Sequence, residues 1–140
     1  KAFGNFSGSV DRWQLYHMHV PSTAIIDFGS AVAGTGAEQG TGDGRIQVFS
    51  CHFITPVTEG RSVDYWLHVR NFEPEDPAIG EGISEQFRIA FAEDKTILSM
   101  IQYEEEKDQR TTRVGLELDA SAGLFRHMVN QRIKEETVPA

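Results

Sequence analysis

The pattern of apolar and polar residues in the first half of the chain predicts four β-strands. The last two alternate clearly with a period of two, which places successive side chains on opposite faces of a strand. The second is indicated by Pro21 and the β-branched residues that follow it. The predicted strands are residues 10–18, 21–28, 45–55 and 61–70. The short segment at residues 56–60 separates the last two runs and predicts a turn between antiparallel strands.

Each strand of this predicted hairpin has one face that carries a histidine. On the third strand one face holds Ile46, Val48, Ser50, His52 and Ile54. On the fourth strand one face holds Asp64, Trp66, His68 and Arg70. The sequence leaves the register of the two strands open, so it does not decide whether these two faces coincide.

The second half of the chain has the period of a helix. Residues 83–106 predict one long helix, and a last helix begins at Asp119 or Ser121 and ends near Glu136. Residues 29–44 hold six of the thirteen glycines and predict a long mobile loop. The segments between the other elements are also irregular: two prolines and two glycines predict a loop at 71–82, and 107–118 allows one short strand at 113–118.

This order, strands first and helices last, predicts the α+β class. The expected architecture is an antiparallel sheet with helices on one face. A long helix that crosses a curved sheet encloses a cavity, which is a common place for a ligand.

Composition and charge exclude several kinds of partner. The 140 residues predict a single domain, with a net charge of −8 and no run of basic residues that could bind nucleic acid. No apolar segment is long enough to span a membrane. Cys51 is the only cysteine, which excludes an internal disulfide and fits a reducing compartment. We therefore expect a cytoplasmic domain that binds neither nucleic acid nor membrane.

Asp94 departs from the helical pattern of its segment. It falls on the apolar stripe, seven residues after Phe87 and seven before Ile101. A buried carboxylate is costly unless it is paired or binds a metal. The alternatives are a functional carboxylate, a helix kink, an N-cap, or a pair with Arg88 or Lys95. Lys95 is a poor partner, because adjacent residues point to different sides of a helix.

Other candidate groups give weaker signals. His17 and His19 would point to one face of a strand, as in some metal sites, but no third ligand lies nearby in the sequence. Cys51 is adjacent to His52, and neighbours on a strand point to opposite faces. A thiol nucleophile is therefore not expected.

Three motifs in this order are specific in combination. They are H-x-x-T-P-x-T at residues 52–58, R-N-F at 70–72 and E-D-K at 93–95. With their surroundings they resemble the C-terminal catalytic domain of Rieske-type non-haem iron oxygenases, in the branch of vanillate and dicamba O-demethylase oxygenase components. The matching segments are residues 10–36, 52–72, 89–102 and 116–133. The resemblance implies a helix-grip (START-like) fold, in which a curved antiparallel sheet packs on a long C-terminal helix.

The resemblance also implies roles for individual residues. The family holds a mononuclear non-haem Fe(II) with two histidines and one aspartate, and Asp94 matches that aspartate. Such a ligand set leaves positions on the metal open. His52 matches a histidine that contacts the acid group of the substrate. Glu85 stands where the dicamba branch has an aromatic residue, so we expect another substrate. The expected apolar walls are Ile46, Val48, Trp66, Phe87 and Phe91.

Parts of the family pattern are absent from this sequence. The family's two iron histidines lie upstream in a D-x-x-H-x-x-x-x-H pattern, which does not occur here. The Rieske 2Fe–2S cluster needs two cysteine–histidine pairs, and this chain has one cysteine. We therefore expect residues 1–140 to be one C-terminal catalytic, substrate-binding domain, a fragment without the Rieske domain and the iron-histidine helix. Alone it would be inactive, with an incomplete iron site.

The resemblance implies an activity for the parent protein. It would hydroxylate or O-demethylate a vanillate-like aromatic acid, with O2 and with electrons from a reductase or ferredoxin, and would form a homotrimer. The alternative is a non-catalytic helix-grip domain that binds a hydrophobic or aromatic ligand without a metal.

Overall fold

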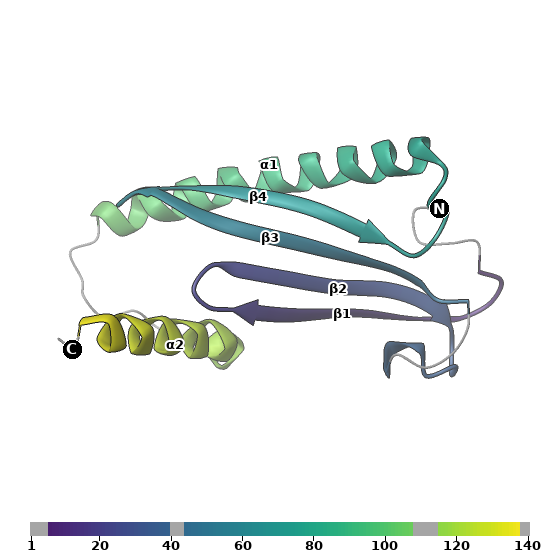
Figure 1. Cartoon of the computed structure of the whole chain (residues 1–140), viewed down its shortest axis with the longest axis horizontal. Coiled ribbons are helices and arrows are strands. Elements are labelled where there is room, and N and C mark those ends of the chain that lie inside the picture. The colour runs from purple at the N-terminus through teal and green to yellow at the C-terminus, as the bar shows by residue number, and fades with distance from the viewer. Residues whose placement is uncertain (1–5, 40–43, 108–114, 138–140) are drawn as a thin grey trace. The chain divides into compact units, whose positions relative to one another are not determined.

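A computed structural model describes residues 6–39, 44–107 and 115–137. Four strands form one antiparallel sheet in chain order (Figure 1). They are β1 (Val10–His19), β2 (Thr23–Val32), β3 (Ile46–Thr58) and β4 (Arg61–Arg70). The helices are α1 (Pro77–Lys107) and α2 (Ala120–Thr137), with short 3-10 turns at η1 (Ala37–Gln39) and η2 (Glu117–Asp119).

The sheet and the C-terminal helix confirm the α+β class. Figure 1 shows that β3 and β4 bend along their length, so the sheet is curved. The chain forms two compact units, one with residues 1–74 and 122–140 and the other with residues 75–121. The sheet therefore belongs to the first unit and α1 to the second. Within the described ranges, no helix is long and apolar enough to cross a membrane.

A small apolar cluster covers part of one face of the sheet. Trp13 of β1 packs with Ala31 of β2 and Ala37 of η1. The indole N–H of Trp13 donates to the Asp27 carboxylate at 3.1 Å, and the amide of Gln47 donates to the same oxygen at 2.8 Å. These bonds link three adjacent strands, because the residues come from β1, β2 and β3.

The opposite face carries the candidate polar residues, and we call it the His52 face. It consists of Val48, Ser50 and His52 on β3 with Asp64, Trp66 and His68 on β4. The register pairs His52 with Trp66 and Ser50 with His68. Directly paired residues of an antiparallel ladder lie on the same face. The two histidine-bearing faces predicted from the sequence therefore coincide.

The structure corrects two predictions in the first half of the chain. The predicted loop at 29–44 is wrong at its start, because β2 continues to Val32. A side chain at Gly29 would collide with the Trp13 ring and the Ile46 carbonyl, so this glycine serves close packing within the sheet rather than a loop. The predicted turn at 56–60 is too long, because β3 continues to Thr58 and only Glu59 and Gly60 form the turn.

The second half requires corrections at the start of each helix. The predicted loop at 71–82 is wrong from Pro77 onward, where α1 begins. The Asp76 carboxylate accepts the N–H of Ala78 at 2.9 Å, as an N-cap does, and proline is favoured directly after such a cap. The described part of the proposed short strand at 113–118 is not a strand and includes part of η2, while residues 113 and 114 lie outside the described ranges.

The last helix is close to its prediction. It begins at Ala120, directly after Asp119, and ends one residue beyond the predicted Glu136. The Asp119 carboxylate accepts the N–H of Leu116 at 2.9 Å, and this bond closes the turn before the helix. Asp119 thus marks the helix start, as the sequence indicated.

Candidate functional site

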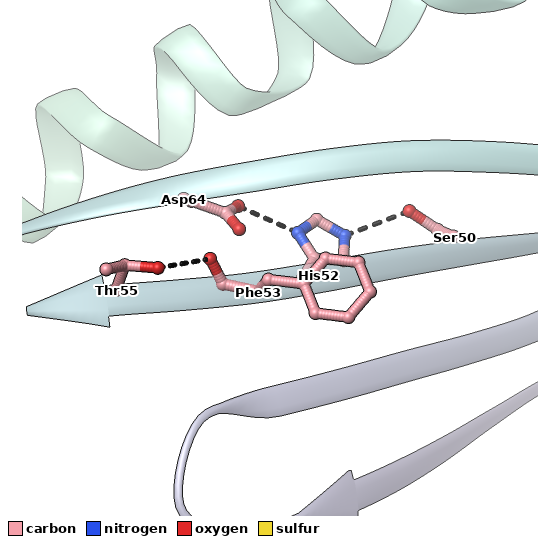
Figure 2. A network of polar contacts seen from close by, with 5 residues as sticks. All are labelled: Ser50, His52, Phe53, Thr55 and Asp64. Atoms are coloured by element: carbon pink, nitrogen blue, oxygen red, sulfur yellow. Dashed lines mark hydrogen bonds and ion pairs between the residues drawn. The ribbon is translucent and has the colours of Figure 1, made fainter.

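His52 is the centre of a polar chain on the sheet. It lies in the middle of β3, and it is 8% exposed. Its Nδ1 lies 2.8 Å from a carboxylate oxygen of Asp64, and its Nε2 lies 2.9 Å from the hydroxyl of Ser50 (Figure 2). Both ring nitrogens are therefore hydrogen-bonded, as expected for a buried histidine.

The local sequence explains why these three side chains meet. Ser50 and His52 are two residues apart on β3 and so point the same way. Asp64 on β4 is paired with Ile54, which makes it a diagonal neighbour of His52 across the ladder. Diagonal neighbours are within reach of a histidine side chain. Further along β3, and separate from these three side chains, the Thr55 hydroxyl donates to the backbone carbonyl of Phe53 at 3.5 Å (Figure 2).

The two ends of the polar chain differ in their contact with solvent. Ser50 is fully buried, whereas the Asp64 side chain is 40% exposed. The polar chain of side chains therefore runs from the solvated carboxylate of Asp64, through His52, to the buried hydroxyl of Ser50. When the His52 ring is protonated, its contact with Asp64 is also an ion pair.

The order serine, histidine, aspartate is also that of a hydrolase triad, with the same ring nitrogens facing the same groups. The burial of Ser50 argues against that chemistry. Its exposed fraction is 0%, and Ile26 and His68 pair with it on either side. A nucleophilic hydroxyl must reach the carbon that it attacks. We therefore read Ser50 as a partner of His52 and not as a nucleophile.

A second histidine, His68, lies next to this polar chain. The rings of His68 and Trp66 are 5.0 Å apart between centroids, and both side chains are half-buried. Burial, and then the nearby His52, lower the pKa of His68 below the usual value of 6.5. His68 is therefore neutral at neutral pH. The Trp66 ring gives the same face a flat apolar surface.

The predicted site residues fall into two groups. Four of them lie on β3 and β4: Val48 and His52 are buried, and Ile46 and Trp66 are half-buried. The other three lie on α1, where Phe87 and Phe91 are half-buried with ring centroids 5.6 Å apart. Asp94 is exposed and follows Phe91 by three residues, so it lies on the same side of the helix.

Sequence reasoning missed two participants of the site. Asp64 and Ser50 were placed on strand faces but were given no role, because the strand register was unknown. His68 was a candidate for the same cavity as His52, and its position relative to His52 was left open for the same reason. The two-residue turn at Glu59–Gly60 fixes only the first pair of the hairpin, and the register shift between Pro56 and Thr58 decides which side chains meet, a shift for which Pro56 is the signal in the sequence. His17 and His19 lie on β1, and they are exposed. His17 pairs with Ile25, which in turn pairs with Cys51, so these three residues share one face of the sheet. His52 follows Cys51 and therefore points to the opposite face.

The described residues contain no group of three or more histidine, cysteine, aspartate or glutamate side chains that could hold a metal ion. These residues do not by themselves form the 2-His-1-carboxylate set that a mononuclear iron needs. Asp94 can contribute one carboxylate at most.

Comparison with known proteins gives consistent matches over nearly the whole chain. The family model "Vanillate O-demethylase oxygenase C-terminal domain" matches residues 1–135. The iron–sulfur subunit of a toluene-4-sulfonate monooxygenase system from Comamonas testosteroni is 33% identical over 97% of this chain and 40% of its own length. A vanillate O-demethylase oxygenase subunit from Pseudomonas sp. (strain ATCC 19151) is 30% identical over 91% of this chain and 39% of its own length.

The chain thus spans about two fifths of the length of these relatives. No solved structure matches it. The family match extends across both compact units and includes the motifs at residues 52–58, 70–72 and 93–95. The resemblance noted in the sequence is therefore confirmed, and the chain belongs to the family of vanillate O-demethylase oxygenase C-terminal domains.

Proposed function

We propose that this chain is the substrate-binding part of an oxygenase that hydroxylates or O-demethylates an aromatic acid. Two relatives support this class of substrate, because they are named for toluene-4-sulfonate and vanillate, which are both aromatic anions. In the protein that carries it, the chain would form the C-terminal catalytic domain. O2 and electrons from a reductase or ferredoxin would complete the reaction, and a homotrimer is the proposed assembly.

The placement of His52 carries the proposal. A buried imidazole lies directly opposite Trp66 in the ladder, with Val48 buried on the same face. Binding sites for small aromatic molecules combine apolar walls with a few fixed polar groups. Here the indole and Val48 provide apolar surface for a ring, and His52 provides a polar atom for its acid group. Ile46 extends this surface on β3, and the role of Phe87 and Phe91 as apolar walls stays a prediction from the sequence.

Asp94 is the proposed contribution of this chain to an iron site. The described residues do not complete such a site, so the other ligands would come from elsewhere in the parent protein. The Rieske 2Fe–2S cluster would also lie outside this chain, which has one cysteine. We therefore expect little iron affinity and no turnover from the isolated chain, because one carboxylate does not make a metal site.

Substitution of Asp94 in the complete oxygenase tests the metal role. Asp94→Asn should strongly reduce bound mononuclear iron and product formation while it leaves the absorbance of the Rieske cluster unchanged. Glu93→Gln is the matched control, since it removes a neighbouring exposed carboxylate from the same helix. Normal iron content and normal turnover in Asp94→Asn would remove Asp94 from the site.

A pair of substrates tests the role of His52. For a methoxybenzoate, hydroxylation of the methyl group gives an unstable product that releases formaldehyde, which can be measured. His52→Gln should raise KM for the acid and change KM for its neutral methyl ester much less. Equal effects on acid and ester would contradict an interaction between His52 and the acid group. Binding of the acid without any O2 consumption by the complete protein would favour a non-catalytic binding domain.

A further inference from the structure

The contact between Asp64 and His52 determines where the hydrogen on the imidazole lies. An ionised carboxylate can only accept hydrogen bonds. At 2.8 Å from Asp64, the Nδ1 of His52 must therefore carry a hydrogen and donate it. In the neutral ring, Nε2 then holds a lone pair and accepts the hydroxyl hydrogen of Ser50, 2.9 Å away. The ring has one tautomer that satisfies both partners.

The opposite tautomer is disfavoured by the same contacts. A hydrogen on Nε2 would leave the lone pair of Nδ1 facing the carboxylate of Asp64 at hydrogen-bond distance, which is repulsive. Ser50 does not oppose either form, because a hydroxyl rotates and can both donate and accept. The choice of tautomer therefore depends on Asp64, which leaves the lone pair on Nε2.

We propose that Asp64 is a positioning residue that fixes the tautomer and ring orientation of His52, so that Nε2 holds the lone pair that can take up a proton from solvent. The N–H formed there can donate to the acid group of a ligand, while the Nδ1–H continues to donate to Asp64. This role resembles that of groups that orient histidines elsewhere by holding one ring nitrogen. It rests on the proposed function only for the identity of the ligand, an aromatic acid. Asp64 itself is partly exposed on β4 and acts through His52.

Three variants of the chain test the proposal by its spectroscopic signature. Asp64→Val removes the acceptor and places a β-branched residue on a strand, where it is tolerated. Asp64→Asn keeps an acceptor oxygen of the same shape without the charge. Glu59→Gln is the control, because it removes a carboxylate from the turn of the same hairpin. Circular dichroism confirms that each variant is folded.

Nitrogen NMR of the 140-residue chain, with 15N-labelled histidine, reports which nitrogen of His52 carries the hydrogen. We expect almost all of the neutral ring to carry it on Nδ1 in the wild type and in Glu59→Gln. In Asp64→Val the Nδ1–H form should become the minor one, and Asp64→Asn should be intermediate. An unchanged tautomer in Asp64→Val would overturn the proposal, as would a wild-type ring with its hydrogen on Nε2.

Steady-state kinetics of the complete oxygenase give a second, independent readout. Asp64→Val should raise KM for a methoxybenzoate about tenfold to a hundredfold, the size expected when a charge-assisted hydrogen bond is lost, with a smaller change in kcat. Asp64→Asn should recover part of the affinity. A changed tautomer with an unchanged KM would support the positioning role of Asp64 and contradict the proposed contact between His52 and the substrate. An unchanged KM together with an unchanged tautomer would overturn both.

Discussion

Gly29 provides the sharpest test of the sheet packing. It lies in β2 directly opposite Trp13 of β1. A β-carbon at this position would collide with two atoms of the indole ring and with the carbonyl oxygen of Ile46. The indole could shift, but the carbonyl belongs to the backbone of β3, which is held in the sheet by its own ladder. The substitution Gly29→Ala therefore forces either the tryptophan or the strand to move.

The cost follows from the packing around Trp13. Trp13 is 9% exposed and forms a cluster with Ala31 and Ala37. Additional methyl groups in a well-packed core typically cost about 1–3 kcal/mol. For a chain of this size, each kcal/mol lowers the melting temperature by about 3 °C, so Gly29→Ala should melt about 3–9 °C below the wild type. Tryptophan fluorescence during urea unfolding is the appropriate assay, because Trp13 and Trp66 both lie in the sheet.

Two further variants separate this collision from a general effect of replacing glycine. Gly123→Ala in α2 makes the same chemical change at a helical position with open space around it, and should leave stability unchanged or raise it by about 0.5–1 kcal/mol. Trp13→Phe in the Gly29→Ala background removes the two colliding ring atoms and should make the added methyl less costly than in the presence of Trp13. An unfolding midpoint of Gly29→Ala at or above that of the wild type would refute the reasoning.

Three more predictions concern single polar groups. Ser30 is 1% exposed, and its hydroxyl has no hydrogen-bond partner within the described residues, so Ser30→Ala should be neutral or stabilising by up to about 1 kcal/mol in urea unfolding. Asp76→Ala removes the N-cap of α1 and should lower its stability by about 1 kcal/mol, measured by thermal circular dichroism, with Glu75→Ala as the control. His68 has a pKa below 6.5 when folded, so the unfolded chain binds the proton more readily and the free energy of unfolding falls as the pH drops below 6.5. His68→Gln should reduce the slope of unfolding free energy against pH in this range, and an equally steep slope would contradict burial of His68 as its cause.

The sequence carried enough information for the class of the fold. Alternation in residues 45–55 and 61–70 marked two strands, and the face of β3 that it assigned to Val48, Ser50 and His52 is the buried one. This works because burial of one face of a strand forces the alternation that the sequence displays. Helical spacing likewise located α1 and α2, since an amphipathic period extends over many residues.

The errors arose where a local signal had two meanings. Glycine at position 29 indicated a loop, but close packing against a tryptophan on the neighbouring strand also requires a residue without a side chain. Pro77 indicated a break, but directly after Asp76 it is a favourable first residue of a helix. In each case the deciding fact is a contact, and neither a composition count nor a periodicity contains it.

The candidate site depended on one irregularity in the ladder. Across the turn Thr58 pairs with Arg61, and an uninterrupted hairpin would then place His52 opposite Leu67. A shift in register between Pro56 and Thr58 instead places His52 opposite Trp66. A slip of one residue exchanges the faces of a strand, so without this bulge His52 and Asp64 would lie on opposite sides of the sheet. The extra residue, Val57, is therefore what brings the carboxylate to the histidine. Proline at position 56 suits such a bulge, because the ladder there does not need its missing N–H.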